Sequence, residues 1–258
     1  MNESKSKQSQ LFLNWSDNEV HTLNWFNSLQ ISNQLVHKYL NSGLIKKLGG
    51  GAYVKAKDKL DWQAAISTVQ TELNLPIHVG GRSVFDLLGA SQYLSRGKRP
   101  TVFVIIREKV RVPIWLKQND WGVEFHFKTS RLFEDDLGFE VFKKSKFEIT
   151  ISSRERAIME VIDTMDLSKT FETLEQYFEG LTNIRSELTQ KLLETCNSVK
   201  VKRVFLYMVT KLDLPVSRKI DKKRIDLGSG KRAIVKNGVL DKTFNITVPK
   251  TDNESEGP

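Results

Sequence analysis

The chain has 258 residues, of which 39% are hydrophobic, 28% are charged and one is cysteine, and its formal net charge is +9. This composition is close to that of an average soluble protein and excludes fibrous, collagen-like and mostly disordered chains. No apolar run reaches the roughly 18–20 residues that a membrane-spanning helix needs, and the N-terminal residues lack the apolar segment of a signal peptide. A single thiol cannot form an internal disulfide, so we expect a cytoplasmic protein.

The first 55 residues are predicted to form three helices and a hairpin. The helices are expected to end at residue 15, to run from a capping box of Ser16 and Glu19 to residue 28, and to run over residues 32–41. Two apolar runs around the Gly49–Gly51 turn predict the hairpin over residues 44–55. This order is typical of a winged helix-turn-helix, whose second helix enters the major groove of DNA.

The helix over residues 32–41 divides into an apolar face and a polar face. Asparagine and glutamine pair with adenine, whereas lysine and histidine reach guanine or phosphate. The same pattern is also typical of an ordinary amphipathic helix, so it does not by itself prove DNA binding. The predicted DNA contacts on this helix are Ser32 as N-cap, Asn33, Gln34, His37 and Lys38.

The hairpin carries lysines on both sides of its glycine turn. Lys46, Lys47 and Lys55 flank a turn that we expect to be mobile, as in a wing that touches DNA phosphates.

Residues 58–95 are predicted to form two more helices, the second capped by Ser83. The Gly80–Gly81 loop before it could bind a phosphate, although such a pair more often only lets the backbone turn. The composition changes near residues 95–100. We therefore expect a DNA-binding domain over residues 1–95, a second, α+β domain over residues 96–250 and a disordered tail over residues 251–258.

The second half is predicted to be α+β, without the alternation of a βαβ fold. Its expected strands cover residues 102–106, 123–127, 139–142, 147–151, 224–227, 231–235 and 244–248. The expected helices between them cover residues 156–164, 168–178, 183–196 and 199–212. An Asn237–Gly238 pair is typical of a hairpin turn.

The positive charge is concentrated near the C-terminus. Residues 198–250 carry a net charge of +10, whereas residues 151–197 carry −4. Because some of the cations lie in predicted strands, alternate side chains should share a face. That face could extend the DNA footprint, meet RNA or an acidic protein, or simply be solvated. The predicted basic C-terminal surface comprises Arg218, Lys219, Lys222, Lys223, Arg224, Lys231 and Arg232.

Tests for enzyme signatures give no catalytic site, metal site or cofactor site. The four histidines, at positions 21, 37, 78 and 126, lie on separate predicted elements without a metal-ligand spacing. Cys196 has no basic neighbour that would activate it, and a buried inert thiol is the simpler interpretation. Gly228–Arg232 imitates a phosphate-binding loop, but Arg232 stands where serine or threonine must be. We therefore expect a protein that is not an enzyme and needs no cofactor.

Several short stretches occur in an order typical of one family. They are Ile31–Gly43, Gly50–Tyr53, Trp62, Leu75–Arg82 with Leu87–Gly89, Val112–Trp115, Ile151–Ala157, Asn197–Tyr207 and Ile225–Arg232. In these stretches the chain resembles the AbiEi-type antitoxins of bacterial type IV toxin-antitoxin systems, which act in abortive infection by phages. The resemblance extends over about residues 10–250, with a conservative departure at Ser83–Phe85.

The resemblance implies a regulator with two roles. The winged helix would bind inverted repeats of double-stranded DNA in the operon's own promoter and repress it, and the C-terminal domain would carry the antitoxin activity. The cognate toxin would be a nucleotidyltransferase-like protein that the antitoxin need not contact directly, and no membrane partner is implied. The alternative is an interaction protein that neutralises a toxin or binds RNA through the basic C-terminal surface, without sequence-specific DNA binding.

Overall fold

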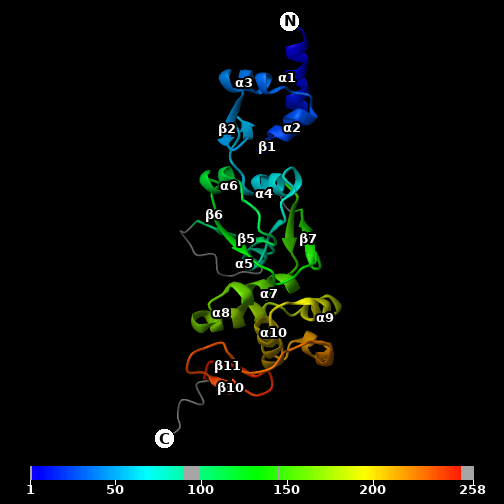
Figure 1. Ribbon diagram of the computed structural model, residues 1–258, viewed down its shortest axis with the longest axis vertical. Coiled ribbons are helices and arrows are strands. Elements are labelled where there is room, and N and C mark those ends of the chain that lie inside the picture. Colours follow the sequence, from blue (N-terminus) through cyan, green and yellow to red (C-terminus); the bar gives the residue numbers. More distant parts are fainter. Residues whose placement is uncertain (1, 90–98, 144–145, 251–258) are drawn as a thin grey trace. The chain divides into compact units, whose positions relative to one another are not determined.

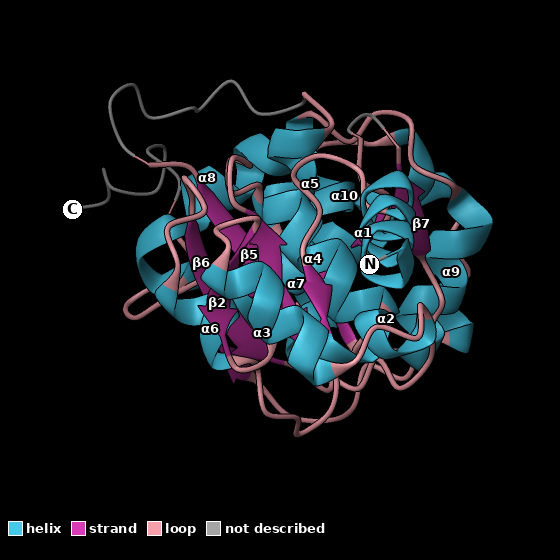
Figure 2. Cartoon of the chain, turned by 90° about the horizontal axis from the view of Figure 1, so that it is seen from above, coloured by secondary structure: helices cyan, strands magenta, loops and turns pink. Residues whose placement is uncertain are grey.

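The computed structural model describes residues 2–89, 99–143 and 146–250, with side chains from residue 7 onward (Figure 1). The predicted domain boundary at residues 95–96 and the predicted tail over residues 251–258 lie outside the described residues. The backbone divides into two compact units. The first comprises Met1–His78, Ser95–Phe127 and Val141–Thr150, and the second comprises Val79–Leu94, Lys128–Glu140 and Ile151–Pro258. Both contain helices and strands, so the protein is mixed α+β as predicted (Figure 2).

The N-terminal part of the first unit is a helix-strand domain of the winged-helix type. Its elements are α1 (Asn2–Asn14), β1 (His21–Thr22), α2 (Leu23–Ser28), α3 (Asn33–Asn41), β2 (Ile45–Gly49) and β3 (Ala52–Lys55). The strands form an antiparallel sheet in the order β1-β3-β2. Side chains from α1, α2, α3 and the sheet share one apolar core that includes Trp15, Phe26 and Tyr39. This core fixes α3 against the hairpin.

The prediction for the second helix was wrong at its start. The main-chain N–H of Ser16 does donate to the Glu19 carboxylate at 2.7 Å, as half of a capping box would. Asn18, however, has a φ of +65°, which ends any helical path there. The chain instead extends through β1, where His21 pairs with Tyr53 of β3. Helix α2 therefore begins only at Leu23.

A five-stranded sheet follows, in the order β6-β5-β4-β8-β7. Its strands are β4 (Ile77–Val79), β5 (Thr101–Ile106), β6 (Glu124–Thr129), β7 (Phe139–Phe142) and β8 (Ile149–Ser152). The four strands predicted here are confirmed, but β4 was missed. Its three residues are buried, and it pairs in parallel with β8. Helices α4 (Trp62–Thr71), α5 (Arg82–Leu87) and α6 (Ile114–Gln118) accompany these strands.

The second unit is built around a buried helix. Its helices are α7 (Arg154–Thr164), α8 (Leu167–Glu179), α9 (Ser186–Thr195) and α10 (Val199–Lys211), all close to their predicted bounds. Helix α7 packs against α5, α8, α9 and α10. Even its charged residues Glu155, Arg156 and Glu160 are each 2% exposed. Such burial requires that every charge be hydrogen-bonded within the protein.

The C-terminal segment corrects three predictions. The strand predicted over residues 224–227 does not form: residues 222–224 are a 3-10 helix, η2 (Lys222–Arg224), and residues 225–227 are irregular. An earlier 3-10 helix, η1 (Pro215–Arg218), precedes η2. The predicted strand over residues 231–235 shortens to β9 (Arg232–Ala233). Strands β10 (Val239–Asp241) and β11 (Ile246–Val248) form the hairpin, and β9 pairs in parallel with β11. Asn237 has the positive φ of a turn, +57°, but its turn does not join paired strands.

Candidate nucleic-acid interface

Helix α3 presents its predicted polar face to solvent. The Ser32 hydroxyl caps the helix by accepting a hydrogen bond from the Leu35 N–H at 3.3 Å. Val36 and Tyr39 are each 2% exposed and face the core. The five residues predicted to contact DNA are all exposed: Ser32, Asn33, Gln34, His37 and Lys38. The structure thus brings together one solvent-facing row of amide, imidazole and ammonium groups.

The turn between α2 and α3 anchors the start of helix α3. Gln30 has a φ of +56°, and Ile31 donates its N–H to the Phe26 carbonyl at 3.0 Å. Ile31 itself is 1% exposed and anchors the turn in the core. Helix α3 is therefore held at both its start and its inner face.

The hairpin divides its three lysines into two groups. Lys46 and Lys47 are exposed on β2, an edge strand of its sheet. Lys55 on β3 differs, because its side chain is only 16% exposed and its ammonium forms an ion pair with Asp17 at 2.6 Å. The hydrogen bond from Lys55 lowers the pKa of the Asp17 carboxyl. Among the residues that the structure describes, the lysines of the hairpin without an acidic partner are therefore those on β2.

The turn of the hairpin is packed, although we expected it to be mobile. The Leu23 N–H donates to the Gly51 carbonyl at 3.1 Å. The Asn119 side-chain amide donates to the Leu48 carbonyl at 2.9 Å. The turn is thus bonded on two sides within the first unit.

The predicted basic C-terminal surface divides in a similar way. Arg218 pairs with Asp213 at 2.6 Å, and Arg224 pairs with Glu194 at 3.0 Å. Lys222 lies 5.2 Å from the centre of the Phe244 ring. The remaining four cations are exposed and have no ion pair within the described part of the chain: Lys219, Lys223, Lys231 and Arg232. Most of the seven predicted cations lie in 3-10 helices and loops, so the prediction that alternate side chains of a strand bring them to one face was wrong.

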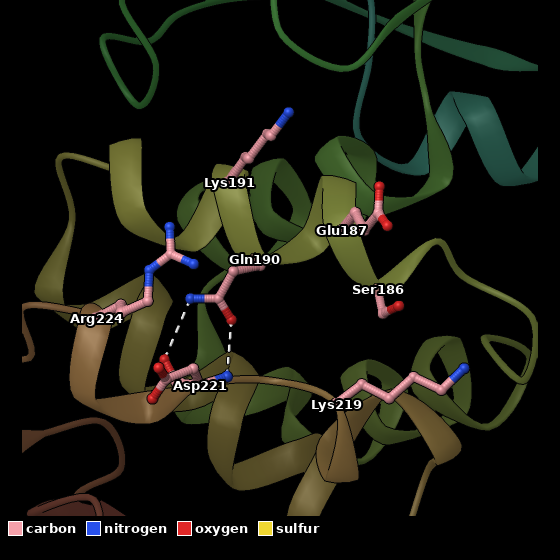
Figure 3. A pocket seen from close by; sticks show the side chains of 7 residues that line it. All are labelled: Ser186, Glu187, Gln190, Lys191, Lys219, Asp221 and Arg224. Atoms are coloured by element: carbon pink, nitrogen blue, oxygen red, sulfur yellow. Dashed lines mark hydrogen bonds between the residues drawn. The ribbon is translucent and has the colours of Figure 1, made fainter.

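A cavity of about 290 Å³ lies between α9 and the 3-10 helices (Figure 3). The Gln190 amide spans it by donating to the Asp221 carbonyl at 3.2 Å and accepting from the Asp221 N–H at 2.9 Å. Its lining mixes both signs of charge: Ser186, Glu187, Gln190, Lys191, Lys219, Asp221 and Arg224. Gln190 and Lys191 were not among the predicted residues, because both lie in the acidic segment that precedes the basic one.

Comparison with known families decides the identity of the chain. Residues 99–249 match a family described as transcriptional regulator, AbiEi antitoxin, type IV TA system. Residues 4–96 match the AbiEi antitoxin N-terminal domain. The chain belongs to the AbiEi antitoxin family. It is an antitoxin and transcriptional regulator of a type IV toxin-antitoxin system, as the resemblance indicated.

Membership of the family implies DNA and a cognate toxin as partners, in a family typically without enzymatic activity. Among solved structures, the chain is similar to the crystal structure of the RV2827C protein from Mycobacterium tuberculosis. The TM-score is 0.53 at 11% identity, and the match covers 88% of this chain and 85% of that one. This likeness shows the fold alone. The comparison with curated proteins gives no match.

Two glycine loops of this AbiEi antitoxin are occupied by internal charges. The Gly81 N–H donates to the Glu160 carboxylate at 2.9 Å, so a side chain already occupies the position suggested for a phosphate. The Arg203 guanidinium donates to four carbonyl oxygens around the Gly228–Gly230 loop, those of Leu227, Gly228, Gly230 and Asn245. A phosphate-binding loop would direct N–H groups inward instead. The first loop is therefore filled by a carboxylate, and the second presents carbonyl oxygens, which do not bind phosphate.

The thiol and the possible metal ligands of the antitoxin are the remaining candidate groups. Cys196 is buried, and burial raises the pKa of its thiol to about 11, which disfavours the reactive thiolate. In the described ranges, His, Cys, Asp and Glu form no group of three or more that could hold a metal ion. Within the same ranges, no helix is both long enough and apolar enough to cross a membrane.

Proposed function

We propose that this antitoxin represses its own operon by binding inverted repeats in the promoter through α3 and β2. The proposal assigns DNA binding to residues 1–95 and antitoxin activity to residues 96–250. The observation that supports it best is the exposed polar row of α3, held by the Ser32 cap and by the buried Val36 and Tyr39. A helix with one side fixed in the core can place its outer side chains in the major groove.

Each exposed group has a defined role in this proposal. Asn33 and Gln34, in the first turn of α3, read adenine through their amides. His37 and Lys38 reach guanine or phosphate from the following turn. Lys46 and Lys47 contact the backbone, where each neutralised phosphate adds affinity that salt weakens. Lys55 takes no direct part, because Asp17 already binds its ammonium.

The antitoxin role of the second domain is assigned to the basic C-terminal surface. In this proposal the cognate toxin is a nucleotidyltransferase-like protein, which is silenced in the cytoplasm without obligatory contact. One observation also favours the alternative, an interaction protein that binds RNA or the toxin. Lys219, Lys223, Lys231 and Arg232 are four exposed cations without an acidic partner in the part that the structure describes. Such charges are suited to phosphate or to an acidic protein surface.

The experiment is a DNA-binding titration of the full chain. A duplex from the region upstream of its own gene is compared with a scrambled duplex of equal length and composition. We expect Gln34→Ala to weaken binding to the first duplex by about 1–3 kcal/mol and to relax the preference at one base pair. Asn41→Ala, at the exposed end of α3, is the matched control.

Two results would contradict the proposal. One is equal affinity of the wild type for both duplexes at physiological salt. The other is unchanged affinity when Asn33, Gln34 and Lys38 are all replaced by alanine.

A further inference from the structure

The wing of this protein is attached at its tip to a helix from far along the chain. Helix α6 lies beyond the range that matches the N-terminal family domain, residues 4–96. It nevertheless belongs to the same compact unit as the hairpin and packs against β2. Figure 1 shows this short helix directly below β2.

Asn119, at the C-terminal end of α6, makes the polar part of the attachment. Its side-chain amide donates to the Leu48 carbonyl at 2.9 Å and to the Trp115 carbonyl at 2.7 Å. One amide group thus joins the last turn of α6 to the main chain of β2. The Leu48 carbonyl directly precedes the Gly49–Gly51 turn, so the bond acts where the hairpin reverses.

Trp115 makes the apolar part of the attachment. It is 1% exposed, and a Cβ built on Gly50 would lie 3.3 Å from its ring carbon Cδ1. Gly50 also has a φ of +51°, which side chains other than glycine rarely adopt. The turn is therefore shaped to lie against the indole, and a side chain at position 50 would disturb both its conformation and its packing.

Helix α6 is itself held in place. The Trp115 and Trp121 rings meet edge to face with centroids 6.0 Å apart, and the Trp121 indole N–H donates to the Leu116 carbonyl at 2.9 Å. Trp121 is 3% exposed. The tip of the hairpin thus binds to a support that cannot easily move.

We propose that Trp115 and Asn119 are positioning residues for DNA binding, which hold the hairpin so that edge strand β2, and not the turn, meets the phosphate backbone. The inference rests on the proposed function. Lys46 and Lys47 are the exposed cations of this strand, and the attached tip leaves them as its phosphate-binding groups. An arm that is already ordered loses less conformational entropy when it binds. The functional DNA-binding unit therefore extends past residue 96 to include α6.

The test is a double-mutant cycle in the full chain. One change is Asn119→Ala, which removes the bond to Leu48 without changing the charge. The other is Lys46→Ala with Lys47→Ala. Affinity for the upstream duplex and its dependence on salt are measured for each variant. The matched control is Gln118→Ala, on the exposed side of the same helix.

We expect Asn119→Ala to weaken binding about 3- to 10-fold, the range that the loss of one hydrogen bond allows. In the wild type, the two lysine changes should lower the salt slope by about 2. In the Asn119→Ala background they should lower it by less than about 1, because the lysines no longer hold their place. Gly50→Ala, which disturbs the same contact from the other side, should reproduce this coupling. Thermal unfolding shows which variants are folded.

The outcomes separate the inference from the proposed function. If the lysine changes lower the slope equally in all backgrounds, Asn119 and Gly50 do not position the wing, and the inference is overturned. If the lysine changes have no effect even in the wild type while α3 variants do, the assignment of phosphate contacts to β2 is wrong. If Asn119→Ala does not fold, Gly50→Ala decides between coupling and additivity.

Discussion

Buried charges in the second unit are each matched by groups within the protein. Arg156 stacks on the rings of Phe133 and Phe139, at 4.6 and 4.2 Å from their centres, and pairs with Glu160 at 3.1 Å. Glu160 also accepts from the Ser152 hydroxyl at 2.8 Å. Removal of one member of such a set leaves an uncompensated charge, which costs far more than the intact pair contributes. These residues are therefore structural, and the exposed cations are the ones available to partners.

Glu155 is another buried charge of the second unit, and it makes the free energy of unfolding depend on pH. Burial raises the pKa of its carboxyl, but hydrogen bonds from the side chain and main chain of Arg185 outweigh burial and lower the pKa from 4.5 to about 2. A lowered pKa means that the stabilisation is complete above the ordinary pKa and disappears as the pH falls through the folded-state value. The affected window therefore runs from about pH 5 to about pH 2.

We expect Glu155→Gln to reduce the free energy of unfolding by about 1.5–3 kcal/mol at neutral pH. The difference from the wild type should shrink as the pH is lowered through that window, because the unfolded wild-type chain binds a proton at the ordinary pKa of the carboxyl while the folded protein does not. Urea unfolding at neutral pH and at about pH 3 measures both values. Glu187→Gln, an exposed acid on α9, is the control and should show neither effect. A constant difference at both pH values would contradict the assignment.

At the scale of elements, α10 organises the loop that carries two of the free cations. Arg203 is 3% exposed and forms four hydrogen bonds to main-chain carbonyls of residues 227–245, from 2.6 to 3.1 Å. Gly228 has a φ of +58°, and a Cβ there would lie 3.1 Å from the Val199 side chain. The loop is thus tightly held from inside, and Lys231 and Arg232 are left outside.

Arg203→Lys should destabilise the protein by about 1–3 kcal/mol, although the charge is kept. An ammonium group donates from a single point and cannot reach carbonyls arranged around a planar guanidinium. The change in thermal midpoint and faster proteolysis within residues 227–232 are the two measurements. Arg232→Lys, at the exposed start of β9 directly after this loop, should leave both unchanged. Normal proteolytic protection of this loop in Arg203→Lys would show that the four bonds do not hold it.

At the scale of the whole molecule, charge is divided unequally along the chain. The segment 198–250 carries more than the whole net charge of +9. It includes four exposed cations of the basic C-terminal surface that have no ion pair within the described ranges: Lys219, Lys223, Lys231 and Arg232. DNA contacts are proposed for α3 and β2, in the other compact unit. The antitoxin activity and the DNA affinity should therefore respond to different substitutions.

We expect Lys223→Glu combined with Lys231→Glu to impair protection against the cognate toxin. The same change should weaken binding to the upstream duplex less than the α3 variants do, because any contact of this surface with DNA would be non-specific. Co-expression with the toxin and a DNA titration on the same variants are the measurements. Lys128→Glu with Arg131→Glu, equally charged and outside the basic segment, is the control. Full protection by the first variant would show that this surface is only solvated.

Features that depend on local interactions could be predicted from the sequence. Helix α3 could be predicted because its Ser32 cap and the spacing of Val36 and Tyr39 lie within one helix. The helices of the second unit and most strands of the large sheet followed from periodicity in the same way. The family resemblance, confirmed by the comparisons, supplied the antitoxin role, which no residue pattern carries alone.

Features that depend on residues far apart in the sequence could not be predicted and became visible only in the folded protein. Ile77–Val79 is a strand because β8 pairs with it, and three residues are too few to show a period. Lys55 forms an ion pair with Asp17, and Asn119 donates to the Leu48 carbonyl of the hairpin. Both pairs are too far apart in the sequence for a periodic pattern to reveal them. Main-chain groups need partners wherever the chain folds back, and those partners are set by packing. Tertiary packing therefore determines whether each candidate side chain is exposed or already bonded to another residue.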